Sequence, residues 1–163
     1  MKDAVLRAGE VNVEYAKKLV ADIPDERMAE QPAPGMNHAA WVLGHLTFVG
    51  DSMIRVFDQP FSMPKEWVEL FNLSSKPTSD RAKYPSKAAL LEAYDRSYAR
   101  LTEAVKNATS ESLEREFPNP KLRTQLPTVG VAMVHILCSH HGLHLGQLSA
   151  WRRALGMAPA VTA

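Results

Sequence analysis

The sequence predicts an all-α protein built as a four-helix bundle, and three observations support this prediction. Four long segments carry apolar residues at the three- and four-residue spacing of a buried helix face. Connectors rich in proline and glycine separate these segments. No segment alternates apolar and polar residues over several positions, as a half-buried strand would. The length of 163 residues suits one domain, spanning 1–163, with a substantial core.

The first two helices precede the longest connection. Residues 3–22 repeat apolar side chains at helical spacing, which predicts the first helix. Asn37 is a favourable N-cap for the second, which we expect to extend to about Phe57. Asp51 and Arg55 are four residues apart on the polar side of that helix, so a solvated ion pair is expected.

The second connection, residues 58–85, is unusually long and contains four prolines. Residues 65–71 inside it are spaced as a short helix with apolar anchors. A loop of this length either covers a site as a lid or simply crosses between helices, and the sequence supports both interpretations.

The last two helices follow this connection. Ser86 is placed to cap the third helix, which should end near Ala108, and residues 109–113 begin a short extra turn. The fourth helix is predicted from Thr128 as N-cap to about Leu155. Four long helices joined by two long crossings are the pattern of a helix bundle, which places binding sites between facing side chains.

Two histidines stand out in the fourth helix. At about 100° per residue, His140 and His144 lie one above the other in an apolar stripe, and His141 turns toward the edge of the stripe. Buried polar rings need partners. A metal ion is one such partner, since histidines at this spacing are a common half-site for zinc. A hydrogen bond from each ring to a carbonyl or an acidic side chain would also satisfy them.

The second helix supplies a third histidine. His45 lies in the middle of its apolar stripe, and packing in a bundle lets it meet His140 and His144. Three neutral imidazoles with an open fourth position form a catalytic type of metal site. Zinc suits such ligands, and nickel, iron or manganese also fit these residue types. The residue after His140 is His141 rather than glutamate, so the helical zincin motif with its built-in base is absent.

Composition excludes several functional classes. The net charge of +1 offers no basic field for nucleic acid, so we expect no nucleic-acid partner. No apolar run reaches the roughly 18 residues of a membrane span, and the N-terminus does not resemble a secretory signal. These features predict a cytoplasmic protein without a membrane partner. The single Cys138 excludes an internal disulfide and reads as a packed thiol.

Three motifs together resemble the DinB/YfiT-like family of metalloenzymes. They are Trp41-Val-Leu-Gly-His45-Leu, His140-x-x-x-His144-x-Gly146-Gln147 and Arg152-Arg153-Ala-Leu-Gly156. The order of helices and the long second connection also fit this family across nearly the whole chain. Each motif is weak alone, but the combination at this separation is fairly specific.

The resemblance implies a bundle in up-down-down-up order and a divalent metal, often zinc or nickel, bound by His45, His140 and His144. It also implies homodimers. Family members with an assigned activity are transferases and isomerases that use low-molecular-weight thiols such as bacillithiol or mycothiol, so it further implies a thiol co-substrate and a small-molecule substrate.

Two further residues are candidates near the metal. Gln147 lies one turn beyond His144 and could orient a ligand or a metal-bound water, or it could be a buried amide bonded to another helix. His38 lies two turns before His45 and could line the mouth of the pocket, cap the helix or lie on the surface.

Three functional hypotheses remain open from the sequence. The first is an enzyme, a metal-dependent thiol S-transferase or related hydrolase with an open coordination position. The second is a non-catalytic, dimeric, stress-related binding bundle with a structural or vestigial metal site. A metal carrier or sensor is the third. Coordination number distinguishes the first two, because a structural site would close its fourth position with a protein group.

Overall fold

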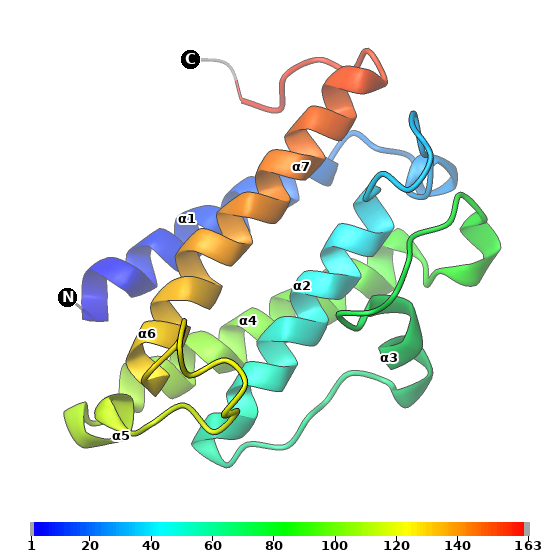
Figure 1. Ribbon diagram of the computed structural model, residues 1–163. Coiled ribbons are helices and arrows are strands. Elements are labelled where there is room, and N and C mark those ends of the chain that lie inside the picture. Colours follow the sequence, from blue (N-terminus) through cyan, green and yellow to red (C-terminus); the bar gives the residue numbers. More distant parts are fainter. Residues whose placement is uncertain (1, 162–163) are drawn as a thin grey trace.

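Four long helices pack side by side in the computed structural model, which describes residues 2–161 (Figure 1). α1 (Lys2–Val20) and the C-terminal α7 (His141–Ala154) run in one direction. α2 (Ala39–Met53) and α4 (Lys87–Asn107) run in the other, which gives the predicted up-down-down-up order. The described part of the chain contains no strand, and its only β-type pairing is one isolated bridge.

Shorter elements fill the connections. The second connection holds α3 (Lys65–Phe71), at the residues predicted, and the 3-10 turn η3 (Arg81–Lys83). Two more 3-10 turns, η1 (Asp25–Arg27) and η2 (Ile54–Phe57), follow α1 and α2. α5 (Ser110–Glu114) forms the short extra turn after α4.

Side-chain caps define where the helices begin. Ser86 and Thr128 accept hydrogen bonds from backbone N–H groups of the first turn, as predicted. α2 differs, because its N-cap is His38 rather than Asn37: Nδ1 of His38 accepts a hydrogen bond from the Trp41 backbone N–H at 3.2 Å. The Asn37 side chain does not cap α2 and instead donates a hydrogen bond to Gln147 on α7.

The fourth helix contains a change of geometry that the periodicity did not predict. α6 (Val129–Val134) leads into a π-helical turn, η4 (His135–His140), and only then into α7. The wider turn rotates the residues after it relative to those before it, and such turns are common at functional sites. The prediction that His141 turns toward the edge of the stripe is therefore wrong, because its side chain is fully buried against Tyr94 of α4.

Asp51 corrects a second expectation. Its side chain is only 1% exposed, and Oδ2 accepts hydrogen bonds from the Ser62 backbone N–H, the Ser62 hydroxyl and the Met63 backbone N–H. The nearest cation is Arg100, whose Nη1 lies 3.5 Å from Oδ1. The predicted solvated pair with Arg55 is wrong because the connection after η2 folds back over Asp51 and excludes water from it.

The core lies between the four long helices, and each contributes fully buried side chains to one continuous cluster. The largest members from the four helices are Leu19, Leu43, Tyr94 and Trp151. No helix within residues 2–161 is long and apolar enough to cross a membrane. The bundle interior is thus where the buried histidines must find their partners.

Candidate metal centre

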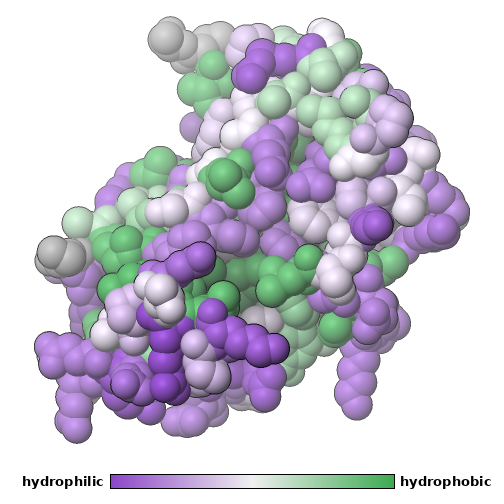
Figure 2. Space-filling model, in the orientation of Figure 1, coloured by the Kyte–Doolittle hydropathy of each residue, from purple (hydrophilic) through white to green (hydrophobic). Residues whose placement is uncertain are grey.

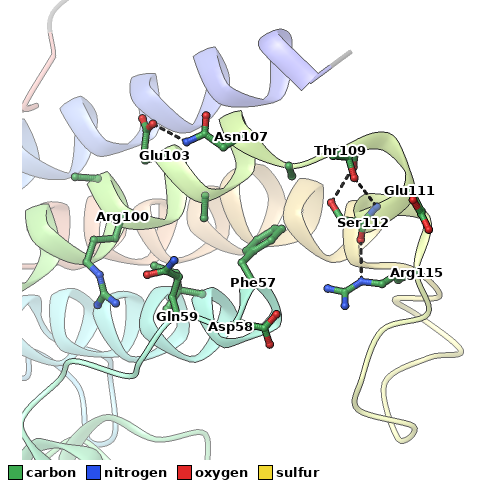
Figure 3. A pocket seen from close by; sticks show the side chains of 14 residues that line it. Phe57, Asp58, Gln59, Arg100, Glu103, Asn107, Thr109, Glu111, Ser112 and Arg115 are labelled. Carbon is green, nitrogen blue, oxygen red and sulfur yellow. Dashed lines mark hydrogen bonds between the residues drawn. The ribbon is translucent and has the colours of Figure 1, made fainter.

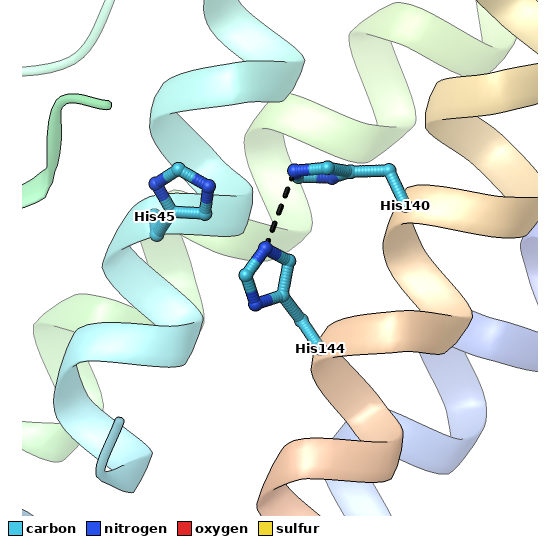
Figure 4. Close-up of side chains that lie close together, drawn as sticks. All are labelled: His45, His140 and His144. Atoms are coloured by element: carbon cyan, nitrogen blue, oxygen red, sulfur yellow. Dashed lines mark hydrogen bonds between the residues drawn. The ribbon is translucent and has the colours of Figure 1, made fainter. Parts of the chain in front are cut away.

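The three predicted histidines converge at one interior point (Figure 4). His45 projects from the middle of α2, His140 ends the π-helical turn and His144 lies on α7. One ring nitrogen from each lies within 4.8 Å of the other two. The Nε2 atoms of His140 and His144 are 3.2 Å apart.

Hydrogen bonds on the outer side of two rings determine which nitrogen faces inward. Nδ1–H of His45 donates to the backbone carbonyl of Phe71 at 2.9 Å, and Nδ1–H of His144 donates to Oε1 of Gln147 at 2.9 Å. The same Gln147 oxygen accepts a second hydrogen bond from the Asn37 amide at 3.0 Å, which identifies it as an acceptor. Both rings, when neutral, therefore present an Nε2 lone pair to the centre, as metal-binding histidines do when their other ring nitrogen donates to an oxygen.

His140 is left without a full set of partners. Its Nδ1 is buried with no hydrogen-bond partner among residues 2–161, and its Nε2 faces the lone pair on Nε2 of His144. Either a proton on His140 or a shared cation relieves this contact. The 3.2 Å between these two nitrogens is close to the distance between two ligand nitrogens in a tetrahedral zinc site, which is about 3.3 Å for Zn–N bonds of about 2.05 Å. The donor set therefore fits a divalent cation.

Burial keeps all three imidazoles neutral. Loss of solvation lowers the pKa of His140 to about 3 and the pKa of His144 to about 4, with neighbouring histidines adding to both effects. It also lowers the pKa of His45. Neutral imidazole is the form that binds a metal, so the rings need lose no proton at neutral pH.

A sequence profile of the DinB superfamily matches residues 10–148, a span that includes all three histidines. The chain belongs to the DinB superfamily. No curated protein matches it. Among solved structures, a conserved protein from Enterococcus faecalis has a TM-score of 0.75 at 20% identity, over 96% of this chain and 98% of that one. YfiT from Bacillus subtilis has a TM-score of 0.68 at 20% identity, over 96% of this chain and 89% of that one. Its structure is described as "a probable metal-dependent hydrolase with an unusual four-helix bundle topology".

The Gly-His pair on α2 of this DinB-superfamily protein has a clear packing role. A Cβ on residue 44 would overlap the ring of Phe71, so only glycine lets α3 pack this closely on α2. This packing brings the Phe71 carbonyl to His45. Trp41 adds a second support, since its indole stacks on the His45 imidazole with ring centroids 4.6 Å apart. The orientation of His45 therefore depends on α3 as well as on its own helix.

Gly44→Ala is expected to destabilise the protein by about 1–3 kcal/mol, because the added methyl group must displace Phe71 from a packed interior. Urea unfolding measures the change. Gly142→Ala is the matched control: residue 142 is exposed, lies on α7 and has no atom within 4 Å of an added Cβ. Alanine there should be neutral or stabilise the helix slightly. Equal effects of the two substitutions would contradict the packing argument.

The other candidate residues lie outside this group. His38 is fully buried, and its Nε2–H donates to the Thr78 carbonyl at 3.0 Å while Nδ1 caps α2. Both ring nitrogens of His38 therefore have hydrogen-bond partners near the start of α2, and neither bonds the three-histidine group. His141, next in sequence to His140, hydrogen-bonds the Tyr94 hydroxyl at 2.6 Å on a different face of the interior. Sequence reasoning missed the Phe71 carbonyl, for which Gly44 was the only local signal.

Two pockets lie on the bundle. A cavity of about 860 Å³ reaches His140, and its walls are the C-terminal half of α2, the π-helical turn and the segment 117–126. Its lining is mostly apolar and contains no carboxylate. A second cavity, of about 720 Å³, lies between α4, α5 and η2 and includes none of the three histidines (Figure 3). Of these two cavities, the first borders the candidate metal centre, because His140 is part of its wall.

Proposed function

We propose that this protein is a metal-dependent enzyme, a low-molecular-weight-thiol S-transferase or related hydrolase, in which His45, His140 and His144 hold a divalent cation. The observation that carries the proposal is the arrangement of three neutral imidazoles around one point beside an apolar pocket. Membership of the DinB superfamily and the description of YfiT as a probable metal-dependent hydrolase support the same class of site.

Each residue has a defined task in this proposal. The three histidines supply nitrogen ligands and leave a position open for a small molecule. The Phe71 carbonyl and Gln147 hold two of the rings in the tautomer that binds metal. A divalent cation supplies a Lewis acid that lowers the pKa of a thiol or water in its open position. The apolar walls exclude water from the reacting groups.

The lack of a carboxylate in the lining of the cavity favours a thiol as the nucleophile. None of the residues that line the cavity is aspartate or glutamate, and His141 occupies the place of the zincin glutamate. A water molecule that attacks an ester or amide is usually assisted by such a base. A thiol is more acidic than water, so a bound cation would favour its nucleophilic thiolate form without help from a carboxylate. Zinc or nickel is the proposed cation, and iron or manganese fits the same ligands.

The decisive experiment measures thiol transfer with and without metal. Protein stripped with EDTA and reloaded with one equivalent of zinc, nickel, iron or manganese is assayed for conjugation of monochlorobimane to bacillithiol, mycothiol, glutathione or cysteine. We expect at least one thiol to react at least about tenfold faster with reloaded than with stripped protein. Stoichiometric metal without conjugation of any of these four thiols, and without hydrolysis of p-nitrophenyl acetate in a parallel assay, would instead support the non-catalytic binding bundle.

Gln147→Leu is expected to weaken metal binding about 10- to 100-fold, because it removes the acceptor that orients His144. Competition with a chromophoric chelator measures the affinity. Gln125→Leu is the matched control, since that glutamine lies on the wall of the cavity and is exposed. If both variants bound metal equally well, Gln147 would have no role in orienting the ligand.

A further inference from the structure

The cavity beside His140 has two chemically different ends. Along α2 the chain passes from His45 through the apolar wall residues Phe48 and Val49 to Met53, and then to Arg55 at the far end. The wall thus leads from the candidate metal centre to a cation. A molecule that extends from His140 through the cavity would meet Phe48, Met53 and Arg55 in that order.

The opposite wall continues the apolar lining. Ile136 lies four residues before His140 on the π-helical turn, and Phe117, Leu122 and Leu126 come from the segment before α6. Figure 2 shows hydrophobic side chains gathered in a hollow between the last long helix and α2, with hydrophilic side chains around its edge. The middle of the cavity therefore suits a hydrocarbon body rather than a sugar or a peptide backbone.

Arg55 is the cation available to a ligand at the far end. Its side chain is exposed, and no hydrogen bond or ion pair joins it to any of residues 2–161. The nearby Arg100 and Arg115 differ, because they donate to the backbone carbonyls of Pro60 and Val56. Since no carboxylate lines the cavity, the charge of Arg55 is not neutralised there.

We propose that the cavity binds an amphiphilic organic anion, with its apolar body between α2 and the segment 117–126 and its anionic group on Arg55, so that its other end lies beside His140. This inference rests on the proposed function, whose electrophilic substrate class it names. Ten residues separate His45 from Arg55, or about 15 Å of helix, which an extended arginine and a chain of about eight to ten carbons bridge together.

Isothermal titration calorimetry with octanoate and octanol tests the inference on the full-length protein, both EDTA-treated and zinc-loaded. We expect octanoate to bind one per chain in both forms. Arg55→Gln should weaken octanoate about five- to tenfold and leave octanol unchanged, because only the acid carries a charge for the guanidinium. Ser52→Phe, which fills the cavity from α2, should abolish binding of both ligands.

Two further variants make the test independent of folding defects. Ser112→Phe fills the other cavity and should leave octanoate binding unchanged. Leu122 lies at the partly exposed edge of the cavity. Leu122→Glu should weaken the binding of octanoate more than that of octanol, because the two carboxylates repel each other. Circular dichroism and thermal melting confirm that each variant folds.

Unchanged octanoate affinity in both Arg55→Gln and Leu122→Glu would overturn the inference. Octanoate binding that appears only with zinc and ignores Arg55 would also overturn it, because the carboxylate would then sit on the metal. The protein could also bind octanoate through Arg55 yet neither hold metal nor transfer thiols. That result would support the inference and contradict the proposed function. Failure of this inference and failure of the proposed function therefore give different results.

Discussion

His140→Ala is expected to abolish stoichiometric metal binding while the helical fold remains. Structural zinc sites with four ligands bind with roughly 10–16 kcal/mol, or about 3 kcal/mol per ligand, so loss of one should weaken affinity by at least about a hundredfold. Elemental analysis after dialysis and chelator competition measure the loss. Circular dichroism confirms the fold.

The fold should survive because the substitution removes an incompletely hydrogen-bonded polar group rather than a residue of the central core. Nδ1 of His140 is buried without a hydrogen-bond partner among residues 2–161, and the ring borders the cavity. His135→Ala is the matched control, since that histidine lies on the same π-helical turn and lines the same cavity but is outside the three-histidine group. One equivalent of tightly held metal in His140→Ala would place the metal site elsewhere.

Acidification from pH 6.5 to pH 4.5 is expected to unfold the metal-free protein. Burial lowers the pKa of His38 and His144 to about 4 and that of His140 and His141 to about 3, from an ordinary value of 6.5. Below pH 6.5 the unfolded chain therefore binds protons that the folded chain does not. The stability from these neutral rings is complete above pH 6.5 and is lost as the pH falls toward 4.

The expected loss is large compared with the stability of a domain. Each such histidine costs about 1.4 kcal/mol per pH unit in this window, and four together cost roughly 5 kcal/mol per unit, against a total of about 5–15 kcal/mol. Urea unfolding of EDTA-treated protein at several pH values measures the slope. His38→Gln should reduce the slope by about 1.4 kcal/mol per unit, because one titrating ring is removed.

Carboxylates act in a different pH window and do not obscure this result. Hydrogen bonds from Arg152 lower the pKa of Asp22, and those from Lys87 and Arg81 lower the pKa of Asp25. Their stabilisation is lost progressively only below about pH 5, as unfolded aspartates become protonated, so the slope between pH 6.5 and about pH 5 comes from the histidines. Bound metal should shift acid unfolding to lower pH, because metal binds only the folded protein.

A free energy of unfolding that stays constant between pH 6.5 and 4.5 without metal would contradict the argument that burial keeps these histidines neutral.

Helix positions were predictable because they depend on local spacing and local caps. The segment 65–71, the caps Ser86 and Thr128 and the end of α4 lie where the pattern placed them. The N-cap of α2 was misplaced by one residue, because Asn37 is the better cap in isolation but its amide bonds Gln147 across the bundle.

The sequence by itself determined four amphipathic helices and the pair His140 and His144, since residues four apart on a helix are neighbours whatever surrounds them. Only the tertiary structure decided that His45 meets this pair, that the Phe71 carbonyl orients it, and that a π-helical turn sends His141 to another face. These features arise where segments distant in sequence pack together. Backbone carbonyls carry no residue-specific signal, and helical periodicity does not reveal where one extra residue is inserted into a turn.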